Sequence, residues 1–246
     1  GGECTIHPEF DRILEFACEN FNIVGILTNG VAISDRAFEI MIAHADHALA
    51  QICINGDEEY HNKFCKSPIA YQRATESIHR LAQGGVLLRC PINVTVENAH
   101  MVEEVAETVR ALGATGFGVN ICQEYGRMED AIVAEDAAHD HDHTPESGCV
   151  TCPHMFMGKT CRERDEINQQ ALAKGQELGE KYPGFVQLRV EGDAERLVTY
   201  IGNCGAGNRT LYVRSDGRVQ LCPMSADSGI PYHGNLRTSS LADIMR

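Results

Sequence analysis

The stretch IVGILTNGVAISDRAFEIMIAHADHALAQICING, residues 23–56, contains a complete strand–helix–strand repeat and indicates the fold class. Short apolar runs at 23–27 and 49–54 are each followed by small polar residues. Between the runs, Ser34 is a typical helix N-cap, and apolar residues recur every three to four positions from Phe38 to Ala45. The stretch therefore predicts two buried strands joined by a helix.

The same alternation extends in both directions from this repeat. Helices are expected from Phe10, with Pro8 suited to its first turn, and then at 68–83 and 98–112, with strands at 86–95 and 116–121. Pro91 is awkward inside a strand because proline cannot donate a ladder hydrogen bond. Alternating strands and helices predict an α/β fold with a parallel sheet and helices outside it.

The pattern changes after residue 127. A polar, histidine-containing stretch occupies 129–161, and a helix is expected at 164–181. Apolar triplets at 211–213 and 219–221 flank Ser215-Asp216-Gly217, which predicts a β-hairpin, and Ser239 or Ser240 can cap a last helix.

Composition limits the classes of function. The chain has 246 residues and a formal net charge of −14, so the basic face that a nucleic-acid-binding protein needs is not expected, and anionic membranes are disfavoured. Neither a membrane-spanning apolar run nor a signal peptide is visible. The 11 cysteines are an odd number, which favours reduced thiols in a cytoplasmic protein over a disulfide framework.

Polar segments occur where the parallel strands are expected to end, which is where βα-barrel proteins place their chemistry. These segments are Gly1-Gly2-Glu3, Thr28-Asn29-Gly30, Asn55-Gly56-Asp57 and Asn93-Val94-Thr95. Glycines allow a ligand to approach the backbone, and a neighbouring carboxylate can hold an ammonium group. In this order and spacing the segments resemble those of the radical S-adenosylmethionine (SAM) enzymes.

The resemblance implies roles for these residues. Gly1, Gly2 and Glu3 would bind the amino group of the SAM methionine. Polar groups at later strand ends would contact its ribose and carboxylate, and the matching residues are Asn55, Asn93 and Thr95. Thr28 and Asn29 would shape the pocket wall, for which a simple polar turn is an equal alternative.

Three cysteines depart from the family pattern. Cys4 stands where proline is usual, Cys53 where serine is common, and Cys65 where many relatives have an arginine that can hold the SAM carboxylate. A thiol cannot replace a guanidinium fork. All three are interpreted as packing residues, because free cysteine is often buried, and a ligand role is the alternative.

The family holds a four-iron four-sulfur cluster with a Cys-x-x-x-Cys-x-x-Cys loop, and that spacing does not occur in this sequence. We expect the loop upstream of Gly1, by at least one βαβ unit of about 30 residues. The sequence is therefore interpreted as truncated at its start, and the fragment alone as inactive.

Near the C-terminus, Cys204 and Cys222 bracket the expected hairpin, and Cys222 follows Gly217 after four residues. This arrangement resembles the opening of a SPASM or twitch domain, which holds auxiliary iron–sulfur clusters. The resemblance implies that the pair ligates one such cluster, with further ligands beyond Arg246. Two unrelated buried cysteines are the alternative.

A third cysteine group belongs to neither pattern. Cys149, Cys152 and Cys161 suit zinc or an iron–sulfur cluster, and a flexible loop with incidental thiols is the alternative. The histidines of 139–143 are expected to be solvated.

The expected architecture is a partial TIM-like radical SAM barrel at 1–128 without its first strand or strands, a Cys/His-rich insertion at 129–163, a connecting helix and strand at 164–203, and the start of a small α+β cluster-binding domain at 204–246. The resemblance implies cleavage of SAM to a 5′-deoxyadenosyl radical that takes hydrogen from a peptide or protein being matured, with flavodoxin or ferredoxin as electron donor. No residue of this chain is assigned as catalytic. The alternatives are a zinc hydrolase on a βα barrel and a non-catalytic metal-binding relative.

Overall fold

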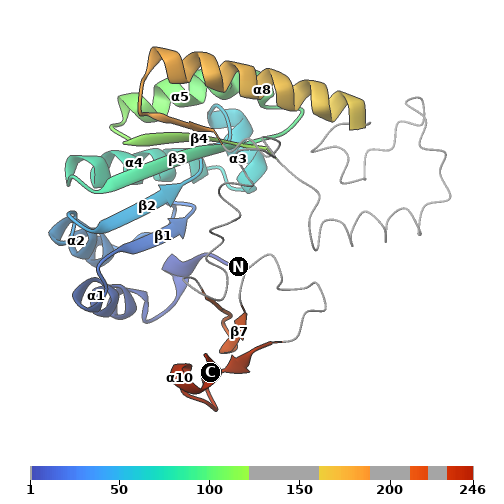
Figure 1. Ribbon diagram of the computed structural model, residues 1–246. Coiled ribbons are helices and arrows are strands. Elements are labelled where there is room, and N and C mark those ends of the chain that lie inside the picture. The colour runs from blue at the N-terminus through green and yellow to red at the C-terminus, as the bar shows by residue number, and fades with distance from the viewer. Residues whose placement is uncertain (1, 122–160, 189–210, 221–231, 246) are drawn as a thin grey trace. The chain divides into compact units, whose positions relative to one another are not determined.

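The computed structural model describes residues 2–121, 161–188, 211–220 and 232–245 (Figure 1). The described residues fall into two compact units. The first contains 2–121 and 161–188, and the second contains 211–220 and 232–245. Each unit is described by itself.

The first unit is built on a five-stranded parallel sheet with the strands in chain order (Figure 1). The strands are β1 (Val24–Thr28), β2 (Ala48–Ile52), β3 (Leu87–Val94), β4 (Gly116–Ile121) and β5 (Val186–Leu188). The helices are η1 (Cys4–Ile6), α1 (Phe10–Asn20), α2 (Asp35–Ala43), α3 (Glu58–Cys65), α4 (Ala70–Gln83), η2 (Ala99–Met101), α5 (Val102–Ala111) and α8 (Cys161–Lys181). The predicted α/β class and parallel sheet are confirmed.

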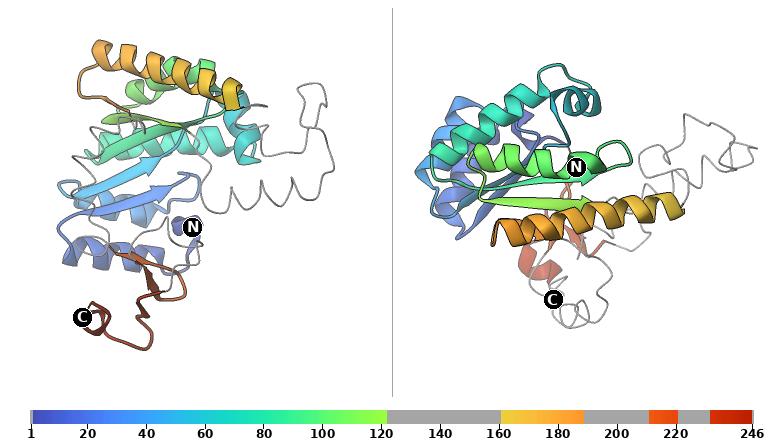
Figure 2. Two further views of the ribbon diagram at one scale, coloured as in Figure 1. Left: turned by 45° about the vertical axis from the view of Figure 1, so that its right-hand side comes forward. Right: turned by 90° about the horizontal axis from the view of Figure 1, so that it is seen from above.

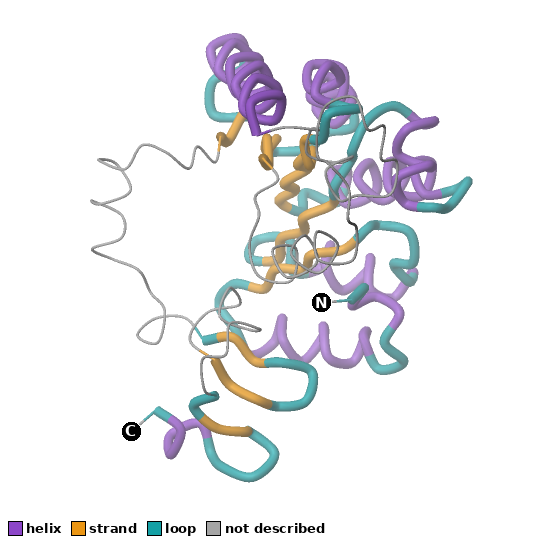
Figure 3. Tube along the Cα trace, turned by 90° about the vertical axis from the view of Figure 1, so that its right-hand side faces the viewer, coloured by secondary structure: helices purple, strands orange, loops and turns teal. Residues whose placement is uncertain are grey.

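The helices of this unit lie along one face of the curved sheet, as Figures 2 and 3 show. Strand residues that point toward the helices, such as Ile26 and Leu88, are buried in a continuous apolar core. Their neighbours on the opposite face are more exposed, and Leu27 and Leu87 are 67% and 53% exposed. We call this opposite side, which includes Gln51 and Arg89, the open face of the sheet.

Pro91 lies inside β3 without breaking the sheet. The β2–β3 ladder ends at Arg89, whereas pairing of β3 with β4 continues to Val94. The carbonyl of Pro91 points toward β2, where it accepts the Ile54 N–H at 3.1 Å. The missing N–H of Pro91 therefore falls on the side where regular pairing has already ended.

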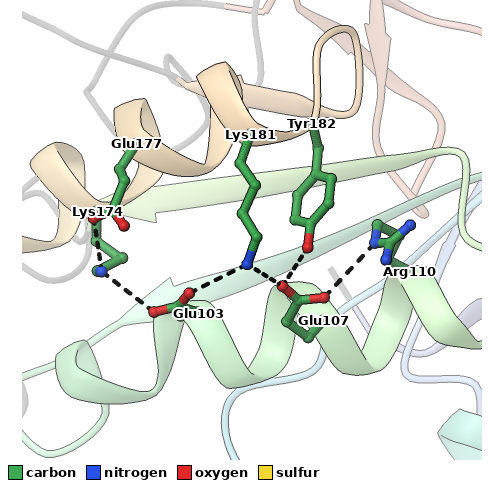
Figure 4. Close-up of polar contacts among 7 residues, drawn as sticks. All are labelled: Glu103, Glu107, Arg110, Lys174, Glu177, Lys181 and Tyr182. Carbon is green, nitrogen blue, oxygen red and sulfur yellow. Dashed lines mark hydrogen bonds and ion pairs between the residues drawn. The ribbon is translucent and has the colours of Figure 1, made fainter.

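Helix α8 packs on α5 through ion pairs (Figure 4). Lys174 contacts Glu103 at 3.2 Å, and Lys181 contacts Glu107 at 2.8 Å. Tyr182, directly after α8, donates its hydroxyl hydrogen bond to Glu107 as well. The helix expected at 164–181 belongs to the first unit as α8, together with β5, which lies within the connecting helix and strand expected at 164–203.

The second unit contains a three-stranded antiparallel sheet of β6 (Tyr212–Val213), β7 (Arg218–Gln220) and β8 (Gly234–Asn235). Gly217 closes the β6–β7 turn at φ +85°, a left-handed conformation that favours glycine. Ser240 caps α10 (Leu241–Ile244) by accepting the Asp243 N–H at 3.2 Å. The predicted hairpin and the Ser240 cap are confirmed over these residues. Among the helices of the described segments, none combines the length and apolarity needed to cross a membrane.

Candidate functional site

Glu3 connects the N-terminal segment to the carboxyl end of β1. Its Oε1 accepts hydrogen bonds from the Thr5 N–H at 3.1 Å and from the Thr28 hydroxyl at 2.6 Å, and Oε2 accepts from the Asn29 N–H at 2.7 Å. The Thr5 hydroxyl adds a bond to Oε1 at 2.8 Å. The carboxylate is therefore held in one place by both chain segments.

Glu3 is also the charged group that an ammonium ligand needs. Burial alone would raise its pKa, but hydrogen bonds from Asn29, Thr28 and Thr5 outweigh burial and hold the pKa below the usual value. Each carboxylate oxygen offers about two lone-pair positions. Oε1 already accepts from Thr5 and Thr28, whereas Oε2 accepts from Asn29 among the described residues and keeps one position for an ammonium N–H. A Cβ built on Gly2 would have no described atom within 4 Å, so the space beside Gly2 is open to a ligand. The residues present fit the methionine ammonium of SAM.

Three asparagine side chains form a row across the carboxyl ends of β2, β3 and β4. The Asn120 amide donates to Asn93 Oδ1, and the Asn93 amide donates to Asn55 Oδ1, each at 3.1 Å. The Asn93 backbone N–H donates to the same Asn55 oxygen at 3.1 Å. We call Asn55, Asn93 and Asn120 the amide row. Asn55 is buried, so the half-buried Asn93 and Asn120 are the members open to a ligand.

Behind the row, Asn98 ties the loops together. Its amide donates to the carbonyls of Asn55 at 2.7 Å and of Asn93 at 2.9 Å, and its Oδ1 accepts the Thr95 N–H at 2.6 Å. The Thr95 hydroxyl bonds to the Tyr60 hydroxyl at 2.8 Å. Thr95 is 3% exposed, so it supports the strand ends from behind.

His61 supports Asn55 from α3. Its Nδ1 accepts the Asn55 N–H at 3.1 Å, which leaves the proton of the neutral ring on Nε2, 3.5 Å from the Cys65 sulfur. Burial lowers the pKa of His61 to about 4. The imidazole is therefore neutral near pH 7 and is suited to positioning Asn55.

The three cysteines that depart from the family pattern have different surroundings. Burial raises the pKa of Cys4 and of Cys53, which keeps both thiols protonated near neutral pH, as packing residues would be. Cys65 is exposed in the last turn of α3, so the expectation that it is a buried packing residue is wrong, although its sulfur contacts His61.

The structure brings Glu3, Thr28 and Asn29 into one cluster, and Asn55, Asn93 and Thr95 into another, both at the carboxyl edge of the sheet. From the sequence, His61 and Asn98 belonged to segments that resemble the family but had no role assigned, and Tyr60 and Asn120 were not singled out. The sequence signal for Asn120 is its place as a polar residue near the end of the strand expected at 116–121, and the structure pairs it with Asn93.

The predicted metal ligands Cys149, Cys152, Cys204 and Cys222 lie outside the described residues, as does Gly1, and the side chain of Cys161 does too. Within the described segments, no group of three or more His, Cys, Asp or Glu side chains is arranged to hold a metal ion.

The sequence is similar to a bacteriocin biosynthesis protein and to a mycofactocin maturase. AlbA of Bacillus subtilis, an antilisterial bacteriocin subtilosin biosynthesis protein, is 27% identical over 225 residues, which are 91% of this chain and 43% of AlbA. The mycofactocin maturase MftC of Mycobacterium tuberculosis is 21% identical over 228 residues, 92% of this chain and 51% of MftC. The chain thus spans about half the length of these relatives. No protein-family model matches it.

Solved structures share the fold. SuiB of Streptococcus suis bound to its precursor peptide SuiA superposes with a TM-score of 0.70 at 14% identity, over 100% of this chain and 52% of SuiB. The anSMEcpe structure with bound AdoMet, which is SAM, gives a TM-score of 0.65 at 16% identity, over 100% of this chain and 62% of that one. The chain has the fold of the radical SAM enzymes. The predicted resemblance is confirmed.

In this radical SAM fold, Glu3 and the amide row both lie where the parallel strands end. They come from different βα loops, as in barrels that assemble one site from several strand ends. The edge presents one fixed carboxylate and several amide donors and acceptors. Such a set can recognise a ligand that carries both an ammonium group and hydrogen-bonding hydroxyls.

Proposed function

We propose that this chain forms the SAM-binding part of a radical SAM enzyme that abstracts hydrogen from a peptide or protein during its maturation. The observation that carries the proposal is the fixed Glu3 carboxylate, which lies at the end of β1 and is kept ionised by its hydrogen bonds. Similarity to AlbA and MftC, and the fold shared with SuiB in complex with SuiA, support a peptide substrate.

When bound beside a reduced iron–sulfur cluster, SAM supplies the 5′-deoxyadenosyl radical that takes the hydrogen atom. The residues of this chain orient the cofactor. Glu3 would hold the methionine ammonium, and Asn93 and Asn120 would offer amides to the ribose hydroxyls. Asn55, Thr95 and Asn98 keep the amide row in place. Orientation is the protein's main contribution when a cofactor carries the chemistry.

The iron–sulfur part of the proposal rests on other segments. The cluster-binding Cys-x-x-x-Cys-x-x-Cys loop does not occur in this sequence. Cys204 and Cys222 would ligate an auxiliary cluster in the full-length protein, Cys149 and Cys152 would bind zinc or a cluster, and flavodoxin or ferredoxin would supply the electron. The zinc-hydrolase alternative accounts for the histidines of 139–143 but leaves Glu3 and the amide row without a role.

The test is SAM binding and cleavage by the full-length protein. Glu3→Gln removes the charge and keeps the shape, and charged hydrogen bonds are worth about 1.5–3 kcal/mol, so we expect about tenfold weaker SAM binding or more. Equilibrium dialysis with labelled SAM measures the affinity, and formation of 5′-deoxyadenosine measures cleavage.

Glu19→Gln, on the exposed side of α1, is the matched control and should bind SAM as the wild type does. Circular dichroism and iron content confirm that each variant is folded and carries its cluster. Unchanged SAM affinity in folded, cluster-containing Glu3→Gln would assign Glu3 a purely structural role. A full-length wild type that does not bind SAM would refute the proposed function.

A further inference from the structure

His47 joins three elements at the edge where the parallel strands begin, opposite the amide row. It lies in the turn 44–47 between α2 and β2. Its ring Nε2 is 3.0 Å from the carbonyl oxygen of Cys18 on α1, and its Nδ1 is 2.8 Å from a carboxylate oxygen of Asp46. Its backbone carbonyl accepts the N–H of Val24, where β1 begins, at 3.1 Å. One residue thus connects the end of α1, the start of β1 and the α2–β2 turn.

The two partners of the ring decide its protonation state. A backbone carbonyl and an ionised carboxylate can only accept hydrogen bonds, so both ring nitrogens need a proton to bond to them. A neutral imidazole carries a proton on one nitrogen only, and its other nitrogen would direct a lone pair at an acceptor oxygen. The arrangement around His47 therefore fits the imidazolium form.

The Cys18 carbonyl is a favourable partner for a cation. It belongs to the last turn of α1, where the carbonyls lack helical N–H partners and the helix dipole presents negative charge. The hydrogen bonds to the Cys18 carbonyl and to Asp46 raise the pKa of His47 above its usual value. The side chain of His47 is 21% exposed and that of Asp46 is 84% exposed, so the helix end is the better shielded of the two partners.

Other titratable side chains surround His47 on the turn and on α1. The hydrogen bond to His47 lowers the pKa of Asp46, so this carboxylate is ionised at neutral pH. Burial raises the pKa of the Cys18 thiol and keeps it uncharged. The ring of His44 packs edge-on against that of His47, with 5.2 Å between the centroids, and Glu19 is exposed beside Cys18 at the end of α1.

We propose that His47 is a proton-dependent clamp, which in its imidazolium form fastens the end of α1 and the start of β1 to the α2–β2 turn. Loss of the proton turns one ring nitrogen into an acceptor that faces another acceptor, so one of the two ring contacts has to open. The connection between α1 and β1, residues 21–23, then opens more easily. The clamp acts on the fold itself, whether or not the chain binds SAM.

The direction of the pH dependence follows from the raised pKa. The folded state holds the proton of His47 more tightly than the unfolded chain, whose histidine pKa is about 6.5. The stabilisation is therefore complete below pH 6.5 and is lost as the pH rises through the pKa of the folded state.

The first measurement is the titration of His47 itself in the full-length protein. Deuterium exchange at the imidazole C2 position, followed by mass spectrometry with fragmentation to separate His47 from His44, reports the protonation of each ring. We expect the midpoint of His47 above 6.5. A midpoint at or below 6.5 would overturn the inference.

The second measurement compares backbone amide exchange at pH 6 and pH 8.5, corrected for the intrinsic effect of pH on exchange. The reporters are the amides of Phe21 and Val24, which donate to the carbonyls of Ala17 and His47. Their protection in the wild type should be about two- to fivefold higher at pH 6, the range for a cation at a helix C-terminus. His47→Gln keeps a neutral donor and should give equal protection at both pH values.

Asp46→Asn separates a clamp from an ordinary surface histidine. Its amide can donate to the unprotonated Nδ1 of His47, so the neutral ring gains a partner and the midpoint should fall. His79→Gln, an exposed change on α4, is the matched control and should keep the wild-type profile. The inference fails if folded His47→Gln shows the pH dependence of the wild type, or if the midpoint in Asp46→Asn does not move.

Discussion

At the scale of the residue, His61 shows how a buried neutral side chain can position a ligand-binding edge. His61 is 2% exposed, and its imidazole accepts the backbone N–H of Asn55, which fixes the first member of the amide row. Protonation of Nδ1 would replace this acceptor by a donor and would place a charge in the core. The position of Asn55 therefore depends on His61 staying neutral.

His61→Gln is expected to flatten the pH dependence of stability between pH 6.5 and about 4. In the folded wild type the pKa is about 4, below the unfolded value near 6.5. The unfolded state then binds more protons in this range, so the free energy of unfolding falls as the pH falls, by at most about 1.4 kcal/mol per pH unit. Urea unfolding at pH 7.5, 6 and 5 measures this slope. Equal slopes for both proteins would show that other groups dominate.

At the scale of the element, the loop between β3 and α5 depends on one asparagine. Asn98 is fully buried and satisfies the carbonyls of Asn55 and Asn93 and the N–H of Thr95. The Asn98 side chain thus supplies hydrogen bonds to backbone groups at a point where the regular β2–β3 ladder has ended.

Asn98→Ala should therefore destabilise the protein by about 2–4 kcal/mol, because buried polar groups left without partners cost about 1–3 kcal/mol each. Chemical unfolding monitored by circular dichroism measures the loss. Asn22→Ala, at an exposed position, is the control and should stay within about 0.5 kcal/mol of the wild type. A loss below 1 kcal/mol in Asn98→Ala would mean that water enters the loop and replaces the amide.

The elements were predictable where one simple period decides them. Helices α2 and α4 and strands β1 to β4 followed from apolar spacing and caps, because burial on one face imposes that spacing. Helix α3 was missed because Glu58–Cys65 is mostly polar, and its start is set by Asp57, which accepts the Tyr60 N–H. Strand β5 has three residues, too few to show a period.

The site was predictable as a set of strand ends but not as a set of contacts. Asn55 and Asn93 are 38 positions apart, and Asn93 and Asn120 are 27 apart. Strand register alone brings them together, and a single sequence does not display register. The supporting roles of Asn98 and His61 were missed for the same reason.

At the scale of the whole molecule, charge opposes and supports the fold at once. The excess of acidic side chains gives a net charge of −14, and their mutual repulsion destabilises the folded state. Between α5 and α8, however, half-exposed glutamates and lysines form ion pairs that stabilise the packing of the two helices (Figure 4). Partnership with Glu107 and Tyr182 raises the pKa of Lys181, so this lysine keeps its charge throughout the physiological range.

A Lys174→Gln/Lys181→Gln variant should be less stable than the wild type at 50 mM NaCl and nearly equal to it at 1 M NaCl. At 1 M salt the Debye length is about 3 Å, so exposed pairs are largely screened. Thermal unfolding at both salt concentrations measures the difference, and Lys63→Gln, which breaks one isolated surface pair, is the control. An equal difference at both concentrations would attribute the effect to packing of the lysine stems.

The amide row has a direction. Its two side-chain hydrogen bonds run the same way along the sheet, from Asn120 to Asn93 and from Asn93 to Asn55. Aligned amide dipoles polarise one another, so each bond strengthens the next. A ligand that accepts or withdraws a hydrogen bond at the β4 end would therefore change the electron density at the β2 end, and no atom of the backbone would need to move. The ends of β2, β3 and β4 are therefore coupled by the polarisation of their hydrogen-bonded amides as well as by packing.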